Sequence, residues 1–230
     1  MSKVDVMKRK ERCLNMRIMF YAYCLVLVFC GMKANAQDWR TMDLRNGDLL
    51  FNVVDTASTS DFSRSIVRST NHRQDVQVNH VAIVCLEDSG VYVLEATGLH
   101  GVWKCPVDTF MAHAGRSANG KPLVLHGRVK GNFDVETSIH KAKQHLGKRY
   151  DYLFSPSDDE FYCSELVQKS YVDKFGELLF PTIPMSFHDE TGKVLQYWID
   201  YYAKRGLSVP EGAPGSNPAG IMKMVDIVGK

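Results

Sequence analysis

The sequence predicts an α+β fold in which an antiparallel sheet packs against helices. In the first half of the chain, short apolar runs alternate with turn-forming residues between positions 46 and 129. From position 134 onward, the apolar residues instead recur at helical spacing. Hydrophobic residues make up 45% of the chain and charged residues 23%, which is ordinary for a globular protein and excludes a collagen-like or compositionally disordered chain.

The predicted strands cover residues 48–54, 78–86 and 91–96, with weaker candidates at 102–107 and 123–129. The second and third of these flank the turn EDSG, so we expect them to form a hairpin. If this turn centres the hairpin, residue 86 opposes 91 and residue 84 opposes 93. His80 and Glu95 are then diagonal neighbours on one face, at a separation that long side chains can bridge.

Helical spacing predicts three helices, over residues 134–147, 163–176 and 189–204. Gly147 is expected to cap the first helix and Gly176 to close the second, since glycine commonly ends helices.

The segment VPEGAPGSNPAG, residues 209–220, is rich in Gly and Pro and predicts an irregular loop. Irregular loops of this length often have a binding role. We therefore expect residues 214–220 to line the substrate cleft.

The first 36 residues resemble a secretory signal peptide. They contain seven basic residues, an uncharged run at 18–30 and a small-x-small site at Ala34-Asn35-Ala36. The uncharged run is shorter than the ~20 residues that span a bilayer. We predict cleavage after Ala36, one domain over residues 37–230 and no membrane span thereafter; whether translation starts at Met1 or Met16 stays open.

The basic signal segment hides the charge of the rest of the chain. Beyond Ala36 there are 21 basic and 24 acidic residues, a formal net charge of −3. No polyphosphate-binding surface is implied, so nucleic acid is not an expected partner.

Three cysteines remain after signal removal, namely Cys85, Cys105 and Cys163. An odd number leaves at least one free thiol in an oxidising compartment. A Cys85–Cys105 disulfide and two separate buried thiols are both compatible with the sequence, because the distance between the two Cα atoms is unknown at this stage.

Cys163 lies at the start of a predicted helix, where the partial positive charge of the helix end favours the reactive thiolate. A buried, purely structural cysteine is the alternative. A nucleophilic cysteine needs a base, and His80 differs from the other histidines because it lies inside an apolar strand and requires a partner. Glu95 is the charged residue of the opposing strand and supplies one, so the three residues form a candidate Cys/His/Glu set.

Five motifs resemble the circularly permuted branch of the NlpC-type papain-like cysteine hydrolases, the YiiX/YaeF-like permuted papain-like amidases. They are NGDLLF (46–51), NHVAIV (79–84), VLEA (93–96), GKRYDYLF (147–154) and YCSELV (162–167). The motif order is the specific feature, because in the usual papain arrangement the cysteine precedes the histidine and here it follows. The resemblance implies a permuted papain-like fold with the sheet packed against the cysteine-bearing helix.

The resemblance also implies roles for individual residues. Cys163 is expected as the nucleophile, His80 as general base and then acid, and Glu95 as the residue that orients His80. Asp48 and Tyr162 match motif positions and are expected to shape the cleft or the oxyanion site. For Asp48, a turn residue that caps the Asn46-Gly47 corner is the alternative.

Together these features predict an exported periplasmic or extracellular hydrolase that cleaves an amide bond through a thioester acyl-enzyme. The expected substrate is a small molecule or peptide, of cell-wall or lipid origin. Two other functions stay open: a papain-like acyltransferase or thioesterase acting on lipid acyl groups, and a non-catalytic cell-wall ligand-binding module. No cofactor or metal is expected, because the sequence has no phosphate-binding Gly-rich loop, His-x-x-x-His or Cys-x-x-Cys motif.

Overall fold

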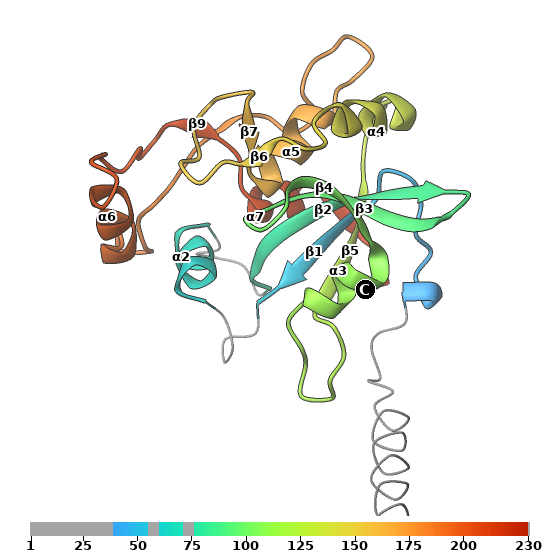
Figure 1. Ribbon diagram of the computed structural model, residues 1–230, viewed down its shortest axis with the longest axis horizontal. Coiled ribbons are helices and arrows are strands. Elements are labelled where there is room, and N and C mark those ends of the chain that lie inside the picture. Colours follow the sequence, from blue (N-terminus) through green and yellow to red (C-terminus); the bar gives the residue numbers. More distant parts are fainter. Residues whose placement is uncertain (1–38, 55–59, 71–75, 230) are drawn as a thin grey trace, which may run out of the picture. The chain divides into compact units, whose positions relative to one another are not determined.

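A six-stranded sheet lies at the centre of the computed structural model, which describes residues 39–54, 60–70 and 76–229 (Figure 1). Its strand order is β10-β5-β1-β2-β3-β4, and every neighbouring pair is antiparallel. The strands are β1 (Leu49–Val53), β2 (Val78–Glu87), β3 (Gly90–Thr97), β4 (Gly101–Pro106), β5 (Val124–Val129) and β10 (Val225–Ile227). Two short ladders pair β6 (Arg149–Tyr150) with β7 (Glu160–Phe161), and β8 (Ile183–Pro184) with β9 (Pro214–Gly215).

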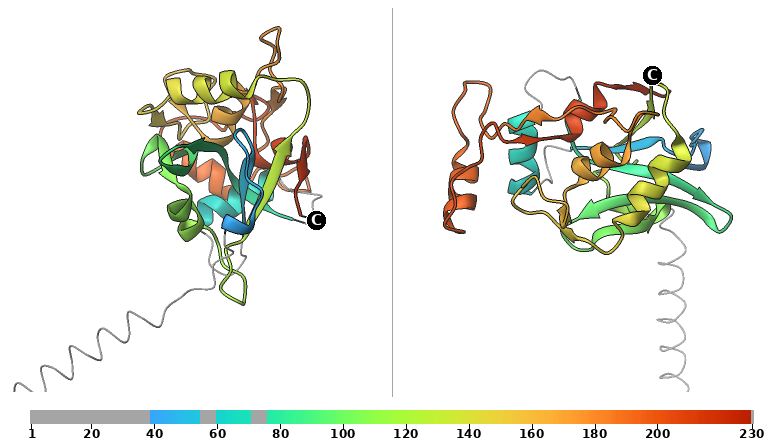
Figure 2. Two further views of the ribbon diagram at one scale, coloured as in Figure 1. Left: turned by 90° about the vertical axis from the view of Figure 1, so that its right-hand side faces the viewer. Right: turned by 90° about the horizontal axis from the view of Figure 1, so that it is seen from above.

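Helices cover both faces of this sheet. They are η1 (Trp39–Thr41), α2 (Asp61–Thr70), α3 (Val107–His113), α4 (Val135–Gln144), α5 (Cys163–Ser170), α6 (Gln196–Ala203) and α7 (Pro218–Met222). The helices α4, α5 and α7 pack on one face and α3 on the other, whereas α2 and α6 pack against each other beside the sheet (Figures 1 and 2). The predicted α+β fold, with an antiparallel sheet against the cysteine-bearing helix, is confirmed. Within the described ranges, no helix has the length and apolar character needed to cross a bilayer.

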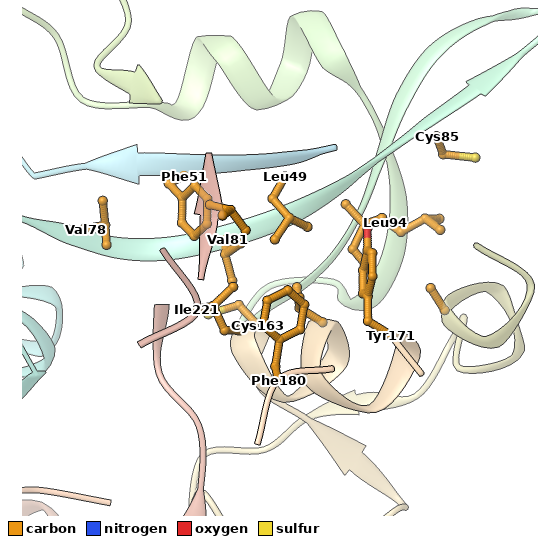
Figure 3. Close-up of a cluster of buried hydrophobic side chains, with 14 of the residues drawn as sticks. Leu49, Phe51, Val78, Val81, Cys85, Leu94, Cys163, Tyr171, Phe180 and Ile221 are labelled. Carbon is orange, nitrogen blue, oxygen red and sulfur yellow. The ribbon is translucent and has the colours of Figure 1, made fainter. Parts of the chain in front are cut away.

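Side chains that alternate along the central strands build two hydrophobic clusters. Leu49 and Phe51 of β1 belong to the cluster under α5, and Leu50 between them belongs to the cluster under α3. Figure 3 shows the first cluster, in which Leu49, Phe51 and Val81 from the strands face Tyr171 from the helical layer. Burial on both faces fixes the register, because a slip by one residue would exchange the two sets of side chains.

The hairpin register agrees with the prediction. Leu86 pairs with Val91 and Val84 with Val93 across the β2–β3 turn.

All three cysteines of the described chain are free and buried. Cys85 belongs to the cluster under α5 and Cys105 to the cluster under α3, on the opposite face of the sheet. Of the two alternatives that the sequence left open, the structure therefore contains two separate buried thiols.

The second predicted helix is five to six residues too long. The helix α5 ends at Ser170, since Tyr171 already has an extended backbone and its hydroxyl donates a hydrogen bond to the carbonyl oxygen of Gly47 at 2.6 Å. Asp173 then forms a turn by accepting hydrogen bonds from the backbone N–H groups of Phe175 and Glu177. The helical spacing of residue 175 is coincidental, because that side chain is 78% exposed.

The third predicted helix begins too early. Residues 189–195 form a turn in which the Asp189 carboxylate accepts hydrogen bonds from the backbone of Thr191 and Lys193, so α6 starts only at Gln196. Side-chain capping of this kind competes with helix formation at Asp and Ser.

The C-terminal segment is more ordered than the predicted irregular loop. It contains strand β9 and helix α7, which begins with Pro218 in its first turn and with Asn217 as its N-cap. Proline suits this position because the first helical N–H groups have no intrahelical partner.

The first predicted helix is correct at its start, where the Asp134 carboxylate caps α4, although the helix ends at Gln144 rather than at Gly147. Helices α2 and α3 were not predicted, since their sequences lack a long apolar period. The predicted signal peptide lies outside the described residues.

Asp48 lies at the start of β1 and is 2% exposed. Its carboxylate lies 2.6 Å from His126 Nε2, accepts two hydrogen bonds from Arg128 and accepts another from the backbone N–H of Arg45. Burial raises the pKa of Asp48, but these hydrogen bonds outweigh it and hold the pKa below its ordinary value. This cluster joins the 45–48 turn to β5.

We expect Asp48→Asn to lower the free energy of unfolding by about 3 kcal/mol. The substitution removes the buried negative charge that pairs with Arg128 and His126, so the charge of Arg128 is left incompletely compensated. Urea denaturation measures this loss. Since the folded-state pKa is depressed, the stabilisation is present above the unfolded pKa and disappears as the pH falls below about 4.

The matched control is Asp43→Asn, which removes an exposed partner of the same arginine. Its expected effect is below about 1 kcal/mol. Equal losses in the two variants would contradict a structural role that depends on the buried charge.

Candidate active site

The helix α5 begins at Cys163, and its N-cap residue Tyr162 has an extended backbone. The buried Glu165 carboxylate lies in the first turn of this helix and pairs with Lys169 at 2.8 Å. Burial raises the pKa of Glu165 to about 7, although Lys169 opposes this shift. The first backbone N–H groups of a helix have no intrahelical partner, and the helix end carries partial positive charge. The Cys163 thiol therefore lies where the unpaired backbone N–H groups and the positive charge of the helix end can act on a bound substrate.

His80 and Glu95 form a close pair on the neighbouring strands β2 and β3. His80 Nε2 lies 2.5 Å from Glu95 Oε2, and the two side chains are 18% and 4% exposed. Burial raises the pKa of Glu95, but the hydrogen bond and charge of His80, with a smaller contribution from Cys105, lower it overall. Glu95 is therefore a carboxylate that fixes the orientation of the imidazole ring.

The His80 side chain also interacts with the Cys163 thiol. Burial alone lowers the pKa of His80, whereas a hydrogen bond and charge interaction with Cys163, followed by those with Glu95, raise it to about 10. The structure thus brings together the three residues that the sequence singled out. Such a set can hold an imidazolium against a thiolate, which is the activated form of a cysteine nucleophile.

Tyr162 lies beside this set, and its hydroxyl accepts a hydrogen bond from the backbone N–H of Ser216 at 3.0 Å. This bond connects the start of α5 to the C-terminal segment. Asp48, by contrast, lines neither of the two cavities that Cys163 lines, so its position corresponds to the turn residue of the alternative interpretation.

Two cavities meet at Cys163. The Trp198 cavity is lined mainly by apolar side chains and by the C-terminal residues Ser216, Asn217 and Pro218. Its empty space of about 510 Å³ includes space that is open to solvent. These three residues belong to the segment 214–220, whose place in a substrate cleft stays a prediction.

The second cavity, the His80 cavity, is wider and more polar. His80 and Glu95 line it together with Trp103 and two further histidines, His100 and His113. His80 and Glu95 do not line the Trp198 cavity, so a ligand reaches the imidazole ring from the His80 cavity and not from the Trp198 cavity.

Two residues at the site were missed by the sequence analysis. Asn79 and Tyr150 line both cavities, and burial together with the charge of Cys163 raises the pKa of Tyr150 above its ordinary value. Both belong to motifs that carried the family resemblance, so polar residues inside those motifs were the available signal.

Among the described residues, no group of three or more His, Cys, Asp and Glu side chains is arranged to hold a metal ion. The donors at this site are instead occupied with one another, as the His80–Glu95 distance illustrates.

Comparisons with known proteins agree with this geometry. Residues 43–194 match the family model of the permuted papain-like amidase enzymes, the YaeF/YiiX or C92 family. The uncharacterised protein YiiX of Escherichia coli K12 is 34% identical over 135 residues, which cover 57% of this chain and 59% of that protein.

The solved structure described as the metalloprotein YiiX from Escherichia coli O157:H7 is similar in fold. It superposes with a TM-score of 0.62 at 27% identity, over 81% of this chain and 97% of that chain. The family match spans most of the chain and includes all the residues gathered at the cavity junction from β2, β3 and α5. The chain belongs to the permuted papain-like amidase family of YaeF and YiiX.

Proposed function

We propose that this protein is an exported cysteine amidase that cleaves a cell-wall peptide or an N-acyl amino acid type substrate. The observation that carries the proposal is that one imidazole has two partners: His80 interacts with both Glu95 and Cys163, and all three residues line one cavity. Membership in the amidase family supports hydrolysis by a cysteine in general terms.

In the proposed reaction, the Cys163 thiolate attacks the substrate carbonyl carbon and forms a C–S bond. The negative charge that develops on the carbonyl oxygen is stabilised by the backbone N–H of Cys163 at the start of α5. His80 then donates its proton to the amine nitrogen as the C–N bond breaks, which leaves a thioester.

In the second half, His80 removes a proton from water as the water oxygen attacks the thioester. The C–S bond breaks and the carboxylic acid leaves, which restores the thiolate and the imidazolium. Glu95 stays ionised throughout, and its role is to orient the ring and to stabilise the charged imidazole.

Export is the second part of the proposal. The basic start, the short apolar run and the Ala34-Asn35-Ala36 site support cleavage after Ala36 and a periplasmic or extracellular destination.

Cys163→Ala should abolish hydrolysis of muropeptides and N-acyl amino acid amides, because it removes the atom that forms the thioester. Mass spectrometry of the products measures this, with an expected loss of at least about 1000-fold. Hydrolysis by the variant at the wild-type rate would show that another group carries the reaction. Products in which the acyl group has moved to an added amine, in place of the free acid, would instead identify an acyltransferase.

Glu95→Gln should lower the alkaline limit of activity. His80 must be protonated to donate to the leaving amine, and its raised pKa keeps it protonated until the pH passes about 10. Without the Glu95 charge the pKa of His80 falls, so the alkaline limb of the pH dependence of kcat/KM moves to lower pH and kcat drops by about 100-fold.

The matched control for this pH profile is Glu87→Gln in the same hairpin. Glu87 pairs with Lys104 and Lys143 and does not line either cavity at Cys163. An alkaline limb that moves equally in both variants would contradict the assigned role of Glu95.

Expression of the full chain in a bacterial host should deliver protein whose N-terminus is Gln37, since the predicted cleavage follows Ala36. Intact mass and N-terminal sequencing of the periplasmic and cytoplasmic fractions measure this. Recovery of uncleaved protein from the cytoplasm alone would argue against export.

A further inference from the structure

Three buried serine hydroxyls line the Trp198 cavity without a hydrogen-bond partner among the described residues. They belong to Ser164 at the start of α5, Ser186 in the segment after β8, and Ser216 in the C-terminal segment. Ser164 is 1% exposed and Ser216 is 7% exposed. Three separate parts of the chain thus bring unpaired polar atoms to one cavity next to the proposed nucleophile.

Unpaired buried hydroxyls are unusual, because most buried polar side-chain atoms in folded proteins have a partner. Leaving such a group unpaired costs about 1–3 kcal/mol, and a ligand that pairs with it recovers that cost. The hydroxyls therefore favour an occupant with hydrogen-bonding groups, and they disfavour a plain hydrocarbon chain that would bury them without a partner.

The remaining wall of the cavity is apolar. Phe154, Met185, Phe187 and Trp198 line it, and the three aromatic rings pack edge to face or tilted against one another. A ligand that fits both parts of the wall has an apolar side chain next to polar backbone groups.

The two cavities also differ in the half of the substrate that they can accept. In the proposed mechanism, on which this inference rests, His80 donates its proton to the leaving amine. His80 lines only the His80 cavity, so the leaving amine belongs there. Cys163 and the start of α5 border the Trp198 cavity, which remains for the acyl half of the substrate.

We propose that the Trp198 cavity is an acyl-side subsite for an aminoacyl or peptidyl group with an apolar side chain. Its amide groups form hydrogen bonds with Ser186 and Ser216, and its side chain packs against Phe187 and Trp198. The enzyme is then selective for peptide-like acyl groups over simple alkanoyl groups of the same size.

Two chloromethyl ketones that share the leucine side chain and the reactive group test the subsite without requiring amide cleavage. One is N-acetyl-leucine chloromethyl ketone, and the other is 1-chloro-5-methylhexan-2-one, which lacks only the acetamido group. In both reactions the Cys163 thiolate forms a bond to the methylene carbon as the C–Cl bond breaks and chloride leaves, and the proton that the thiol gave up stays on His80. Intact mass gives the labelling rates, each divided by the rate of the same reagent with glutathione.

The leucine reagent should label wild-type Cys163 at least roughly 10-fold faster than the alkyl reagent after this correction. Ser186→Ala and Ser216→Ala should each reduce this preference by roughly 3- to 10-fold, mainly by slowing the leucine reagent. Ser170→Ala is the matched control, because Ser170 is buried on the same helix but donates to the Leu166 carbonyl oxygen and lines neither cavity. The preference of Ser170→Ala for the leucine reagent over the alkyl reagent should equal that of the wild type.

The outcomes separate this inference from the proposed function. Labelling of Cys163 by iodoacetamide without any preference between the two ketones overturns the subsite alone. Faster labelling by a long-chain reagent such as 1-chlorododecan-2-one also overturns it, in favour of a lipid acyl occupant. Failure of every reagent to label Cys163 contradicts the subsite and the proposed function together.

Discussion

The starting point of α5 is the constraint on which the rest of the site depends. Because the helix begins at Cys163, the thiol, the free backbone N–H groups and the positive helix end occupy one place. One contact that holds this start in position is the hydrogen bond that the Tyr162 hydroxyl accepts from the backbone N–H of Ser216. A shift by one residue along the helix would rotate the thiol by about 100° away from His80.

The sheet supplies His80 and Glu95, and the packing of its strands leaves their positions little freedom. Both faces of the central strands are buried, so the register of β2 against β3 is set by packing as well as by the hairpin turn. This register brings Glu95 to His80, and the ring of His80 then bridges to the helix. The catalytic arrangement that we propose thus lies where the packed β2–β3 hairpin meets the start of α5, and groups held in place before the reaction need little reorganisation during catalysis.

Features that depend on local pairing could be predicted from the sequence. The β2–β3 register follows from one turn, and this register is enough to predict Glu95 beside His80. Helix ends could not be predicted as well, because side-chain hydrogen bonds decide them: Asp173 and Asp189 form turns where the apolar spacing alone suggested continued helix. Asp48 shows a further limit, since its partners His126 and Arg128 are about 80 residues away and the sequence does not reveal that contact. The cavity beside Cys163 was equally inaccessible, because it is assembled from α2, α5, α6 and the C-terminal segment.

In the proposed mechanism, His80 and Cys163 act as one electrostatic unit with Glu95. The most direct test is an NMR titration of the His80 ring in the wild type and in Cys163→Ala, followed through the ring carbon-bound protons. His80 in the wild type should stay protonated up to a pH of about 10, and its pKa should fall clearly when the sulfur is removed. A wild-type His80 that titrates near the ordinary value of about 6.5, with no change in Cys163→Ala, would contradict the proposed mechanism.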